Sequence, residues 1–494
     1  MKFKELILAS IFANAKRNPK GNSFCIEDHF FTYHDLITSV NKVRPVVRKS
    51  NDLYYGLVVN NDLETYATII ALWCEGKCYV PLHPAQPIER CLSIIEQVDI
   101  KTVFDTSDQS RYDNYTVINS RYLNSNDNNS DELKDFDEDK AAYILFTSGS
   151  TGVPKGVVLS RKNLASFIEA FSKTGIDLNE NDRCLQCFDL TFDVSIQAFV
   201  YPLIKGACVY TVPYNAMKFL VSADMIDKYK LTFIEAAPSM IRFLKPYFDD
   251  FDSSSIKYCI LTAEASDLKL AEEWSKKIPN AKLYDFYGPT EATIYCTYYN
   301  FNRTGLNKAY NGSLSIGKPL PGVDALIVDV DSGEPLAVGE KGELCVAGGQ
   351  VTQGYWKNEE KTKQVFRNIG GVLYYKTGDL CYMDEDGDIL YSGRLDFQAK
   401  IQGFRVELGE IECHVKDFLP NNNVVTMTTI NQYGNTEIVV FVETEKLDSD
   451  SVKAYLEKKL PSYMIPTYIV GVEKFPLNAN YKVDRKELLK ILKK

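Results

Sequence analysis

The sequence predicts an α/β protein, with a large N-terminal domain of mostly parallel sheets flanked by helices and a small α+β domain after it. The chain has 494 residues, more than one hydrophobic core usually serves, so we expect at least two domains. Residues 53–59 and 78–82 have the pattern of strands, and residues 64–74 between them carry apolar side chains at helical spacing. This strand–helix–strand alternation favours a parallel sheet covered by helices. Toward the C-terminus, short strand patterns alternate with helices such as 451–459.

The composition is that of an ordinary globular protein and argues against several classes of function. Hydrophobic residues make up 45% and charged residues 25% of the chain, and the net charge of −10 argues against a general nucleic-acid binder. No apolar run approaches the ~20 residues needed to span a bilayer. The 12 cysteines are scattered, mostly in apolar runs, which favours free thiols in a reducing compartment. The short apolar segment 6–12 could belong to a signal peptide, but its apolar positions also fit one face of a helix. We therefore expect a cytoplasmic protein without a signal peptide.

A loop rich in glycine and hydroxyl side chains lies between two apolar runs, 141–146 and 157–159, which predict strands. Glycines let backbone N–H groups turn toward a ligand, hydroxyls add donors, and lysine supplies a positive charge for phosphate. Pro154 stiffens the chain beside the lysine, which favours a phosphate-binding loop over a flexible hairpin. It is not a Walker A loop, because Lys155 precedes a glycine and a strand. The candidate phosphate ligands are Thr147, Ser148, Gly149, Ser150, Thr151, Gly152 and Lys155.

Residues 145–156, Leu-Phe-Thr-Ser-Gly-Ser-Thr-Gly-Val-Pro-Lys-Gly, resemble the phosphate-binding loop of the adenylate-forming superfamily nearly letter for letter. This superfamily comprises acyl- and aryl-CoA ligases, luciferases and the amino-acid-activating domains of nonribosomal peptide synthetases. The resemblance implies that the loop holds the β- and γ-phosphates of ATP.

Asp193 lies in the apolar stretch 187–197, where a charged side chain needs a structural reason. One explanation is that it caps a helix that begins just after it. The other is that it pairs with the ammonium group of a substrate, because a charge tolerates burial only with such a partner. Amino-acid-activating members of the superfamily carry Phe-Asp-x-Ser at this point, and their aspartate holds the substrate α-amino group. The resemblance therefore favours an amino acid over a fatty or aryl acid as substrate.

Residues 284–293, Tyr-Asp-Phe-Tyr-Gly-Pro-Thr-Glu-Ala-Thr, match the superfamily's most recognisable motif, although alone they indicate only a polar turn. The resemblance implies that an aromatic ring stacks on adenine and that Glu291 ligates Mg²⁺, which prefers oxygen ligands. Residues 376–380, Lys-Thr-Gly-Asp-Leu, resemble the family's ribose clamp, in which Asp379 accepts hydrogen bonds from both ribose hydroxyls. The implied adenine and ribose ligands are Phe286, Tyr287, Gly288, Thr290, Asp379 and Arg394.

The segment 393–412 matches the family's hinge and the strand–turn–helix that follows it. We place the domain boundary near Asp396, with an N-terminal adenylation core over 1–395 and a mobile C-terminal lid over 396–494. Within the lid, residues 476–485 match the motif of the family's catalytic lysine, here Lys482. Tyr481 stands where the family usually has glycine, a departure that bears on the geometry of this loop. Without the resemblance, a lysine so near a charged C-terminus indicates a solvated surface residue.

The resemblance implies a reaction in two steps, with ATP and Mg²⁺ as cofactors and Lys482 and Glu291 as catalytic residues. The substrate carboxylate first attacks the α-phosphorus of ATP, which gives an acyl-adenylate and pyrophosphate. Because two anions meet in this step, charge neutralisation and positioning dominate, and Lys482 would contact both the carboxylate and the α-phosphate. A thiol then attacks the adenylate, after the lid has rotated about Asp396 and withdrawn Lys482.

The chain ends soon after Lys482, so we expect the thiol to be the phosphopantetheine of a separate carrier protein. Stand-alone D-alanine, prolyl and β-amino-acid ligases have this organisation. An acyl- or aryl-CoA ligase that uses free coenzyme A is the main alternative, and a non-catalytic binding or scaffold relative is a third.

The family's pocket pattern also indicates which residues surround the amino acid side chain. Phe286 and Tyr295 make this pocket small or flat. Glu235 either binds a basic or imino nitrogen or is satisfied by backbone donors. No family pattern is matched fully, so D-alanine, proline, a basic amino acid and a β-amino acid all remain candidates. The pocket residues are Val194, Gln197, Glu235, Leu261, Ala263, Phe286, Ile294 and Tyr295.

Overall fold

The computed structural model describes the chain except for residues 1, 125–132, 150–151, 397, 478–482 and 493–494. The chain divides into two compact units, and along the sequence their last division falls between Leu395 and Asp396. The smaller unit also takes in two earlier segments, which the sequence did not indicate. The larger unit comprises Met1–Pro84, Ile95–Phe146 and Gly156–Leu395, and the smaller comprises Ala85–Ile94, Thr147–Lys155 and Asp396–Lys494.

The first sheet runs in the order β6-β5-β3-β4-β7-β8. The pairs β3–β4, β3–β5, β5–β6 and β4–β7 are all parallel. The strands expected over 53–59 and 78–82 and the helix between them are present as β3, α3 and β4, so this part of the α/β prediction is confirmed. The strands are β3 (Tyr54–Val58), β4 (Cys78–Leu82), β5 (Thr102–Phe104), β6 (Thr116–Ile118), β7 (Ala141–Thr147) and β8 (Lys155–Ser160).

The second sheet runs in the order β17-β14-β13-β12-β11-β9-β10-β1-β2. Its strands from β13 to β1 are parallel, whereas β2, β14 and β17 pair antiparallel at the edges. The carboxyl ends of β11, β12 and β13 therefore meet along one edge, which is where ligands bind in open α/β sheets. The strands are β1 (Asn22–Ile26), β2 (His29–Thr32), β9 (Arg183–Gln186), β10 (Cys208–Thr211), β11 (Phe233–Ala236), β12 (Tyr258–Leu261), β13 (Lys282–Tyr287), β14 (Thr297–Asn300) and β17 (Lys318–Pro319).

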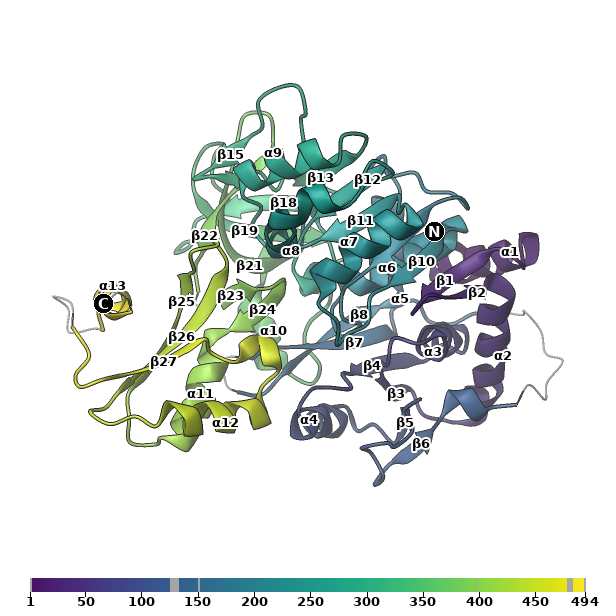
Figure 1. Cartoon of the computed structure of the whole chain (residues 1–494), viewed down its shortest axis with the longest axis horizontal. Coiled ribbons are helices and arrows are strands. Elements are labelled where there is room, and N and C mark those ends of the chain that lie inside the picture. Colours follow the sequence, from purple (N-terminus) through teal and green to yellow (C-terminus); the bar gives the residue numbers. More distant parts are fainter. Residues whose placement is uncertain (1, 125–132, 150–151, 397, 478–482, 493–494) are drawn as a thin grey trace. The chain divides into compact units, whose positions relative to one another are not determined.

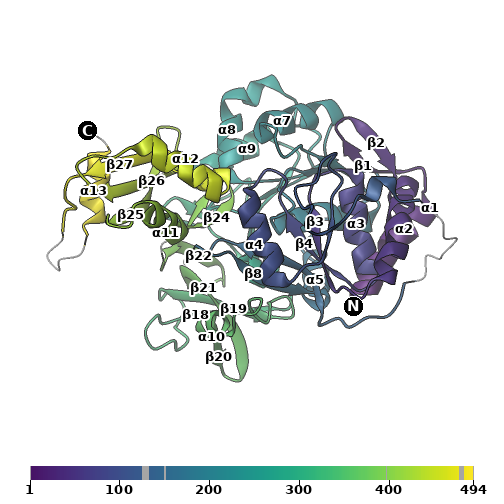
Figure 2. The same ribbon diagram turned by 90° about the horizontal axis from the view of Figure 1, so that it is seen from below.

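Helices cover these sheets, and a continuous hydrophobic core joins α1, α2, α3, α5 and α6. Helix α2 packs beside α3, as Figure 2 shows. Phe3, Ile7 and Ile11 are buried in this core, so the apolar N-terminal segment is helical. The helical segments are η1 (Lys4–Leu8), α1 (Ala9–Arg17), α2 (Tyr33–Lys49), α3 (Leu63–Cys74), α4 (Ile88–Val98), η2 (Ser120–Tyr122), α5 (Arg161–Phe171), α6 (Val194–Lys205), α7 (Lys218–Tyr229), α8 (Pro238–Leu244), η3 (Lys245–Asp250), α9 (Leu268–Lys277), η4 (Thr290–Ala292) and α10 (Glu359–Val365).

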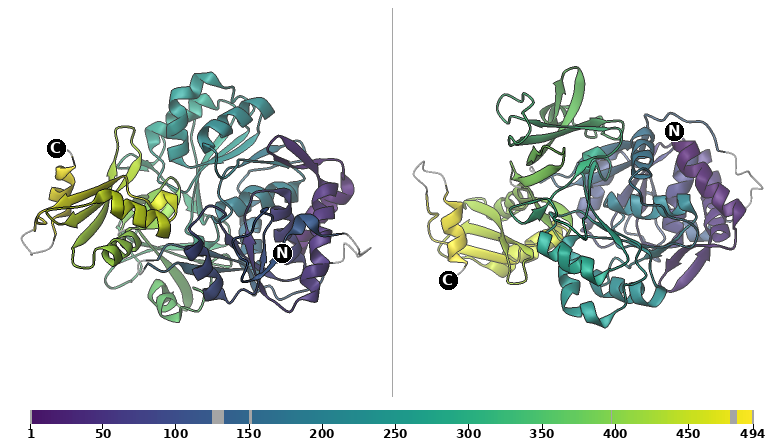
Figure 3. Two further views of the ribbon diagram at one scale, coloured as in Figure 1. Left: turned by 60° about the horizontal axis from the view of Figure 1, so that its bottom comes forward. Right: turned by 90° about the horizontal axis from the view of Figure 1, so that it is seen from above.

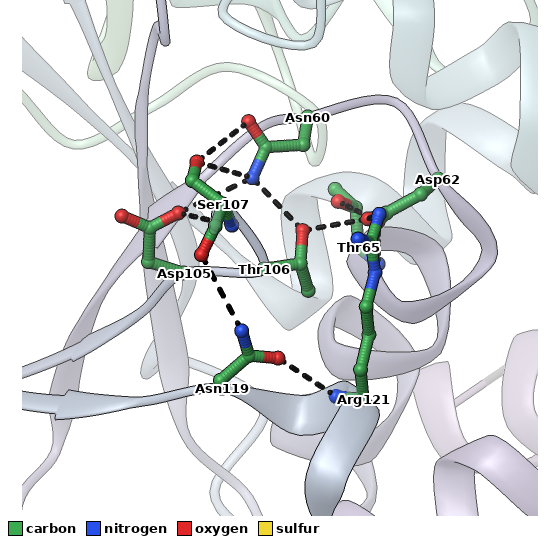
Figure 4. Close-up of polar contacts among 8 residues, drawn as sticks. All are labelled: Asn60, Asp62, Thr65, Asp105, Thr106, Ser107, Asn119 and Arg121. Carbon is green, nitrogen blue, oxygen red and sulfur yellow. Dashed lines mark hydrogen bonds and ion pairs between the residues drawn. The ribbon is translucent and has the colours of Figure 1, made fainter. Parts of the chain in front are cut away.

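A polar network at the carboxyl ends of β3 and β5 fixes the start of α3 (Figure 4). The Asp62 side chain caps α3 by accepting from the Thr65 N–H at 2.9 Å. It also accepts from the Thr106 hydroxyl at 2.6 Å and from Arg121 at 2.8 Å. Asn60 donates to the same Thr106 hydroxyl at 2.8 Å. The network thus ties β3, β5 and the segment after β6 to one helix terminus.

An antiparallel sheet of β18 to β22 forms the end of the larger unit and is green in Figure 3. The acidic turn between β21 and β22 surrounds Lys308, whose Nζ lies 2.7 Å from the carboxylates of Asp384, Asp386 and Asp388. The ammonium group offsets part of the negative charge of this turn. The strands here are β15 (Ala309–Tyr310), β16 (Ser313–Leu314), β18 (Val323–Val328), β19 (Gly342–Gly348), β20 (Phe366–Ile369), β21 (Val372–Met383) and β22 (Ile389–Arg394).

The smaller unit is built on the sheet β25-β26-β27, with α11 and α12 on one face and α13 on the other (Figure 1). Strand β26 alternates accordingly: Ile438 and Val440 pack in the core under α11 and α12, whereas Val439 and Phe441 pack with Leu488 of α13. The elements are β23 (Gln398–Ile401), β24 (Phe404–Glu407), α11 (Leu408–Phe418), β25 (Val424–Ile430), β26 (Thr436–Glu443), α12 (Ser449–Lys459), η5 (Ser462–Met464), β27 (Tyr468–Val472) and α13 (Arg485–Ile491).

The cysteines and the helices agree with two further expectations from the sequence. The cysteines all lie in the described part of the chain, and every one is a free thiol; Cys413 is partly exposed and the others are buried. Among the described residues, no helix is both long enough and apolar enough to cross a membrane.

Candidate active site

Asp193 is a buried carboxyl with an oxygen that no residue in the described part of the chain satisfies. It immediately precedes α6 and is only 4% exposed, and its side chain makes no capping hydrogen bond to the helix. Helix capping therefore does not explain it. Its Oδ2 atom has no hydrogen-bond partner among the described residues. Burial raises the pKa of this carboxyl to about 7, the charge of Glu291 adds to the rise, and the nearby polar groups of Thr290 and Val194 partly oppose it.

Glu291, in the turn η4 after β13, is fully buried. The Tyr355 hydroxyl donates to its Oε1 atom at 2.6 Å, and the Thr352 N–H donates to its backbone carbonyl at 2.8 Å. Tyr355 and Thr352 come from a distant stretch of the larger unit. Neither could be predicted, because nothing in the local sequence pattern connects them to Glu291.

The chain after β13 makes a tight and strained turn. A Cβ atom on Gly288 would lie 2.4 Å from the carbonyl oxygen of Ile294, so only glycine fits there. Thr293 and Ile294 have positive φ angles of 55° and 73°, which β-branched residues rarely adopt. Gln350 holds this turn, since its amide donates to the carbonyl of Ala292 at 2.7 Å and also to that of Tyr295. Gln350 is another positioning residue that the sequence did not reveal.

Three of the residues assigned to ribose and adenine, Tyr287 of β13, Asp379 of β21 and Arg394 of β22, lie together. Arg394 pairs across the sheet with Asp379, and its Nη1 atom lies 2.8 Å from Asp379 Oδ1. The Tyr287 hydroxyl donates to Oδ2 of the same carboxylate. Each carboxylate oxygen can accept a further hydrogen bond. Phe286, by contrast, is 1% exposed and stacks on Tyr298 within the core.

The residues assigned to the side-chain pocket all lie in the larger unit, and most are buried. Val194 and Gln197 come from α6, and Glu235 comes from β11. Leu261 ends β12, and Ala263, Ile294 and Tyr295 lie in the turns after β12 and β13. The Tyr295 hydroxyl donates to Glu235 Oε2 at 3.1 Å.

The glycine-rich loop belongs to the smaller unit, where its donors hold anionic oxygens. The Gly149 N–H donates to Glu410 Oε2 at 3.0 Å, and Lys155 Nζ lies 3.3 Å from Glu407 Oε1. The Ser148 hydroxyl donates to the Arg405 carbonyl at 3.0 Å. A Cβ on Gly149 would lie 2.1 Å from the Val153 carbonyl, so the loop needs glycine there. Thr147, at the end of β7, has a buried hydroxyl, and Gly152 has a positive φ of 81°.

Three predicted site residues, Ser150, Thr151 and Lys482, lie outside the described residues, as does Tyr481. Asp396, the predicted hinge, is described, and its Oδ1 atom accepts from the Gln398 N–H at 3.1 Å.

A larger unit with buried carboxyls beside its parallel sheet and a smaller unit with a glycine-rich loop fit the class of adenylate-forming enzymes that the sequence resembles. Comparison with known proteins agrees. The family model described as AMP-binding enzyme matches residues 11–356. The D-alanine–D-alanyl carrier protein ligase of Lactococcus lactis is 31% identical, over 98% of this chain and 98% of its own length.

Larger proteins and a solved structure are similar as well. Gramicidin S synthase 1 of Brevibacillus brevis is 28% identical over 96% of this chain, which spans only 43% of that synthase. The crystal structure of the Vibrio cholerae adenylation domain AlmE, in complex with glycyl-adenosine-5'-phosphate, superposes with a TM-score of 0.86 at 25% identity, over 99% of this chain and 97% of that one. This chain belongs to the AMP-binding enzyme family, and it is an AMP-forming ligase.

Proposed function

We propose that this protein uses ATP to convert an amino acid to its aminoacyl-adenylate and then transfers the aminoacyl group to the phosphopantetheine thiol of a separate carrier protein. The observation that carries the proposal is the buried Asp193 carboxyl, whose Oδ2 atom has no partner among the described residues. An ionised carboxylate is costly to bury alone, and the α-ammonium group of an amino acid supplies the missing charge and hydrogen bond. A fatty or aryl acid has no such group.

Glu291 would provide the protein ligand for Mg²⁺. Among the described residues, no group of three or more His, Cys, Asp and Glu side chains is placed to hold a metal ion. A single buried carboxylate still fits Mg²⁺, which usually binds one or two carboxylates together with substrate phosphates and water. When bound, the ion would neutralise charge on the phosphates.

The glycine-rich loop would bind the phosphates that leave as pyrophosphate. Its Gly149 N–H and Lys155 ammonium groups already bind carboxylate oxygens of Glu410 and Glu407. Phosphate oxygens have the same charge and hydrogen-bonding character as these carboxylates, so the loop's donors suit them. Asp379 would in turn accept from the ribose hydroxyls.

ATP–pyrophosphate exchange tests the function directly. The wild-type protein is offered each proteinogenic amino acid, D-alanine, β-alanine, and a set of fatty and aryl acids. We expect exchange to depend on an amino acid. The adenylate is then offered coenzyme A or the phosphopantetheinylated D-alanyl carrier protein of Lactococcus lactis, and we expect loading of the carrier only. Exchange with fatty or aryl acids alone, and transfer to coenzyme A, would show instead an acyl- or aryl-CoA ligase.

Tyr355→Phe is expected to raise the Mg²⁺ concentration for half-maximal exchange about tenfold, because loss of a hydrogen bond to a metal ligand typically costs 10- to 100-fold in metal affinity. The Tyr355 hydroxyl donates to Glu291 at 2.6 Å. The measurement is a Mg²⁺ titration of the exchange rate at saturating ATP and amino acid. Tyr310→Phe, which removes an exposed hydroxyl beside Lys341, is the control. An unchanged Mg²⁺ dependence in Tyr355→Phe would contradict a metal-ligand role for Glu291.

A further inference from the structure

Glu235 is a carboxyl placed inside the second sheet with only part of its hydrogen-bonding capacity used. It lies on β11, between β9 and β12, and it is fully buried. The Tyr295 hydroxyl donates to its Oε2 atom, but its Oε1 atom has no hydrogen-bond partner among the described residues. Acidic side chains are almost never fully buried unless a partner compensates for the lost hydration. One explanation from the sequence was that backbone N–H groups satisfy Glu235. Among the described residues, no backbone N–H donates to its Oε1 atom.

A second buried polar side chain lies beside Glu235 and is also unsatisfied. Gln197, on α6, is fully buried, and in the described part of the chain neither its amide nitrogen nor its amide oxygen has a hydrogen-bond partner. Burial raises the pKa of Glu235, and the Gln197 side chain partly opposes that rise, so the two side chains lie close together. Buried polar atoms are normally hydrogen-bonded, so two such side chains close together form a polar site that a hydrogen-bonding ligand can satisfy.

Tyr295 connects this pair to the carboxyl of Asp193. Burial raises the pKa of the Tyr295 hydroxyl and the charges of Glu235 and Asp193 add to the rise, so the hydroxyl lies near both carboxyls. Each of the two carboxyls has one oxygen that accepts no hydrogen bond from the described residues. The larger unit therefore holds two carboxyls near Tyr295, each with an acceptor oxygen that no described residue satisfies.

Among the described residues, no cation contributes to the pKa shift of Glu235. Besides Tyr295 and Gln197, its charge acts on the thiols of Cys184, Cys187 and Cys259, all of which are neutral. Burial raises the pKa of Glu235 to about 8, so the carboxyl is largely protonated at neutral pH until a positive charge arrives. An apolar side chain such as that of alanine would leave Glu235 and Gln197 unpaired.

We propose that the substrate is an amino acid with a basic side chain, whose nitrogen donates to Glu235 and Gln197 while its α-ammonium group pairs with Asp193. The inference rests on the proposed function and specifies its substrate class. The side-chain cation would ionise Glu235, donate to Oε1, and place a second N–H on the amide oxygen of Gln197. Glu235 is then the residue that selects the side chain, and it does not contact the reacting carboxylate.

The test compares amino acids that differ by one nitrogen. Ornithine is paired with norvaline, which has the same carbon skeleton without the side-chain amine, and lysine, arginine, citrulline and D-alanine complete the series in ATP–pyrophosphate exchange. We expect kcat/KM for a basic amino acid to exceed that for its apolar analogue about 100-fold or more, because a buried polar site rejects a ligand that leaves it unpaired. Glu235→Gln, which keeps the shape of the side chain, should lower kcat/KM for the basic substrate at least 30-fold and leave norvaline unchanged or better.

The pH profile separates recognition from a structural role. In the wild type, kcat/KM for the basic substrate should fall as the pH drops below about 8, because Glu235 then takes up a proton, and Glu235→Gln should lack this step. A preference for norvaline, citrulline or D-alanine over every basic amino acid would overturn the inference and leave the proposed function standing. An unchanged order of kcat/KM among these amino acids in Glu235→Gln would also overturn the inference and leave the proposed function standing. Exchange with no amino acid at all would overturn both.

Discussion

Lys482→Ala is expected to abolish adenylate formation while thiolation of a preformed aminoacyl-adenylate continues. In the first step a substrate carboxylate must approach the α-phosphate of ATP, and the two negative charges repel each other. A lysine that contacts both groups stabilises the transition state where that charge accumulates. Removal of a single preorganised group of this kind typically costs 10²- to 10³-fold in kcat. In the second step the attacked group is already an activated acyl carbon, and this lysine has no comparable role.

Two assays distinguish the steps. ATP–pyrophosphate exchange measures the first, and single-turnover transfer from chemically prepared aminoacyl-adenylate to the carrier protein measures the second. Lys490→Ala is the matched control, since Lys490 is an exposed lysine on α13 that pairs with Glu487. It should leave both rates unchanged. If Lys482→Ala slowed both steps equally, Lys482 would be needed for the lid as a whole and not for adenylation.

The local architecture could be predicted from the sequence wherever hydrophobic periodicity determines burial. Residues 54–82 form β3, α3 and β4 close to the expected bounds, because β3 and β4 are buried and apolar and α3 is buried along its length. The helix expected over 451–459 is present as α12, which spans Ser449–Lys459. Asp193 could be singled out as well, because a carboxylate in an apolar stretch conflicts with the pattern around it.

The environment of the site could not be predicted in this way. Arg90 and Glu410 form a buried ion pair at 2.6 Å within the smaller unit, although 320 residues separate them in the chain. Tyr355 reaches Glu291, and Gln350 holds the turn after it, by the same kind of long-range contact. Such pairs depend on how sheets and helices pack, and no periodicity or spacing encodes them. The sequence also could not tell whether the Asp193 side chain caps α6. The side-chain geometry shows that it makes no capping hydrogen bond.

Asp193→Asn is expected to reduce kcat/KM for the amino acid about 30-fold or more. Breaking one partner of a buried, hydrogen-bonded charge pair costs about 2–5 kcal/mol, and each 1.4 kcal/mol corresponds to about a tenfold change. Because asparagine has nearly the same shape but no charge, the substrate α-ammonium would lose its counter-charge while the fold is retained. In the wild type, kcat/KM should also fall as the pH drops below about 7, where Asp193 takes up a proton, and Asp193→Asn should lack this step. Asp177→Asn, at an exposed carboxylate, is the control.

Thermal unfolding distinguishes this role from simple misfolding. If Asp193 is kept for its charge, Asp193→Asn should stabilise the fold, whereas a misfolded variant would be less stable than the wild type. Burial raises the pKa of Asp193 from 3.8 to about 7, so the folded state favours the protonated carboxyl. The stabilisation from that proton is fully present below pH 4 and is lost as the pH rises toward 7. Above pH 7 the wild type carries a buried charge that Asp193→Asn does not. The variant should therefore melt at a higher temperature than the wild type at pH 8, with the difference disappearing at acidic pH. A variant that is inactive yet more stable at pH 8 would show that Asp193 is kept for its charge, whereas a destabilised one would show that it supports the fold.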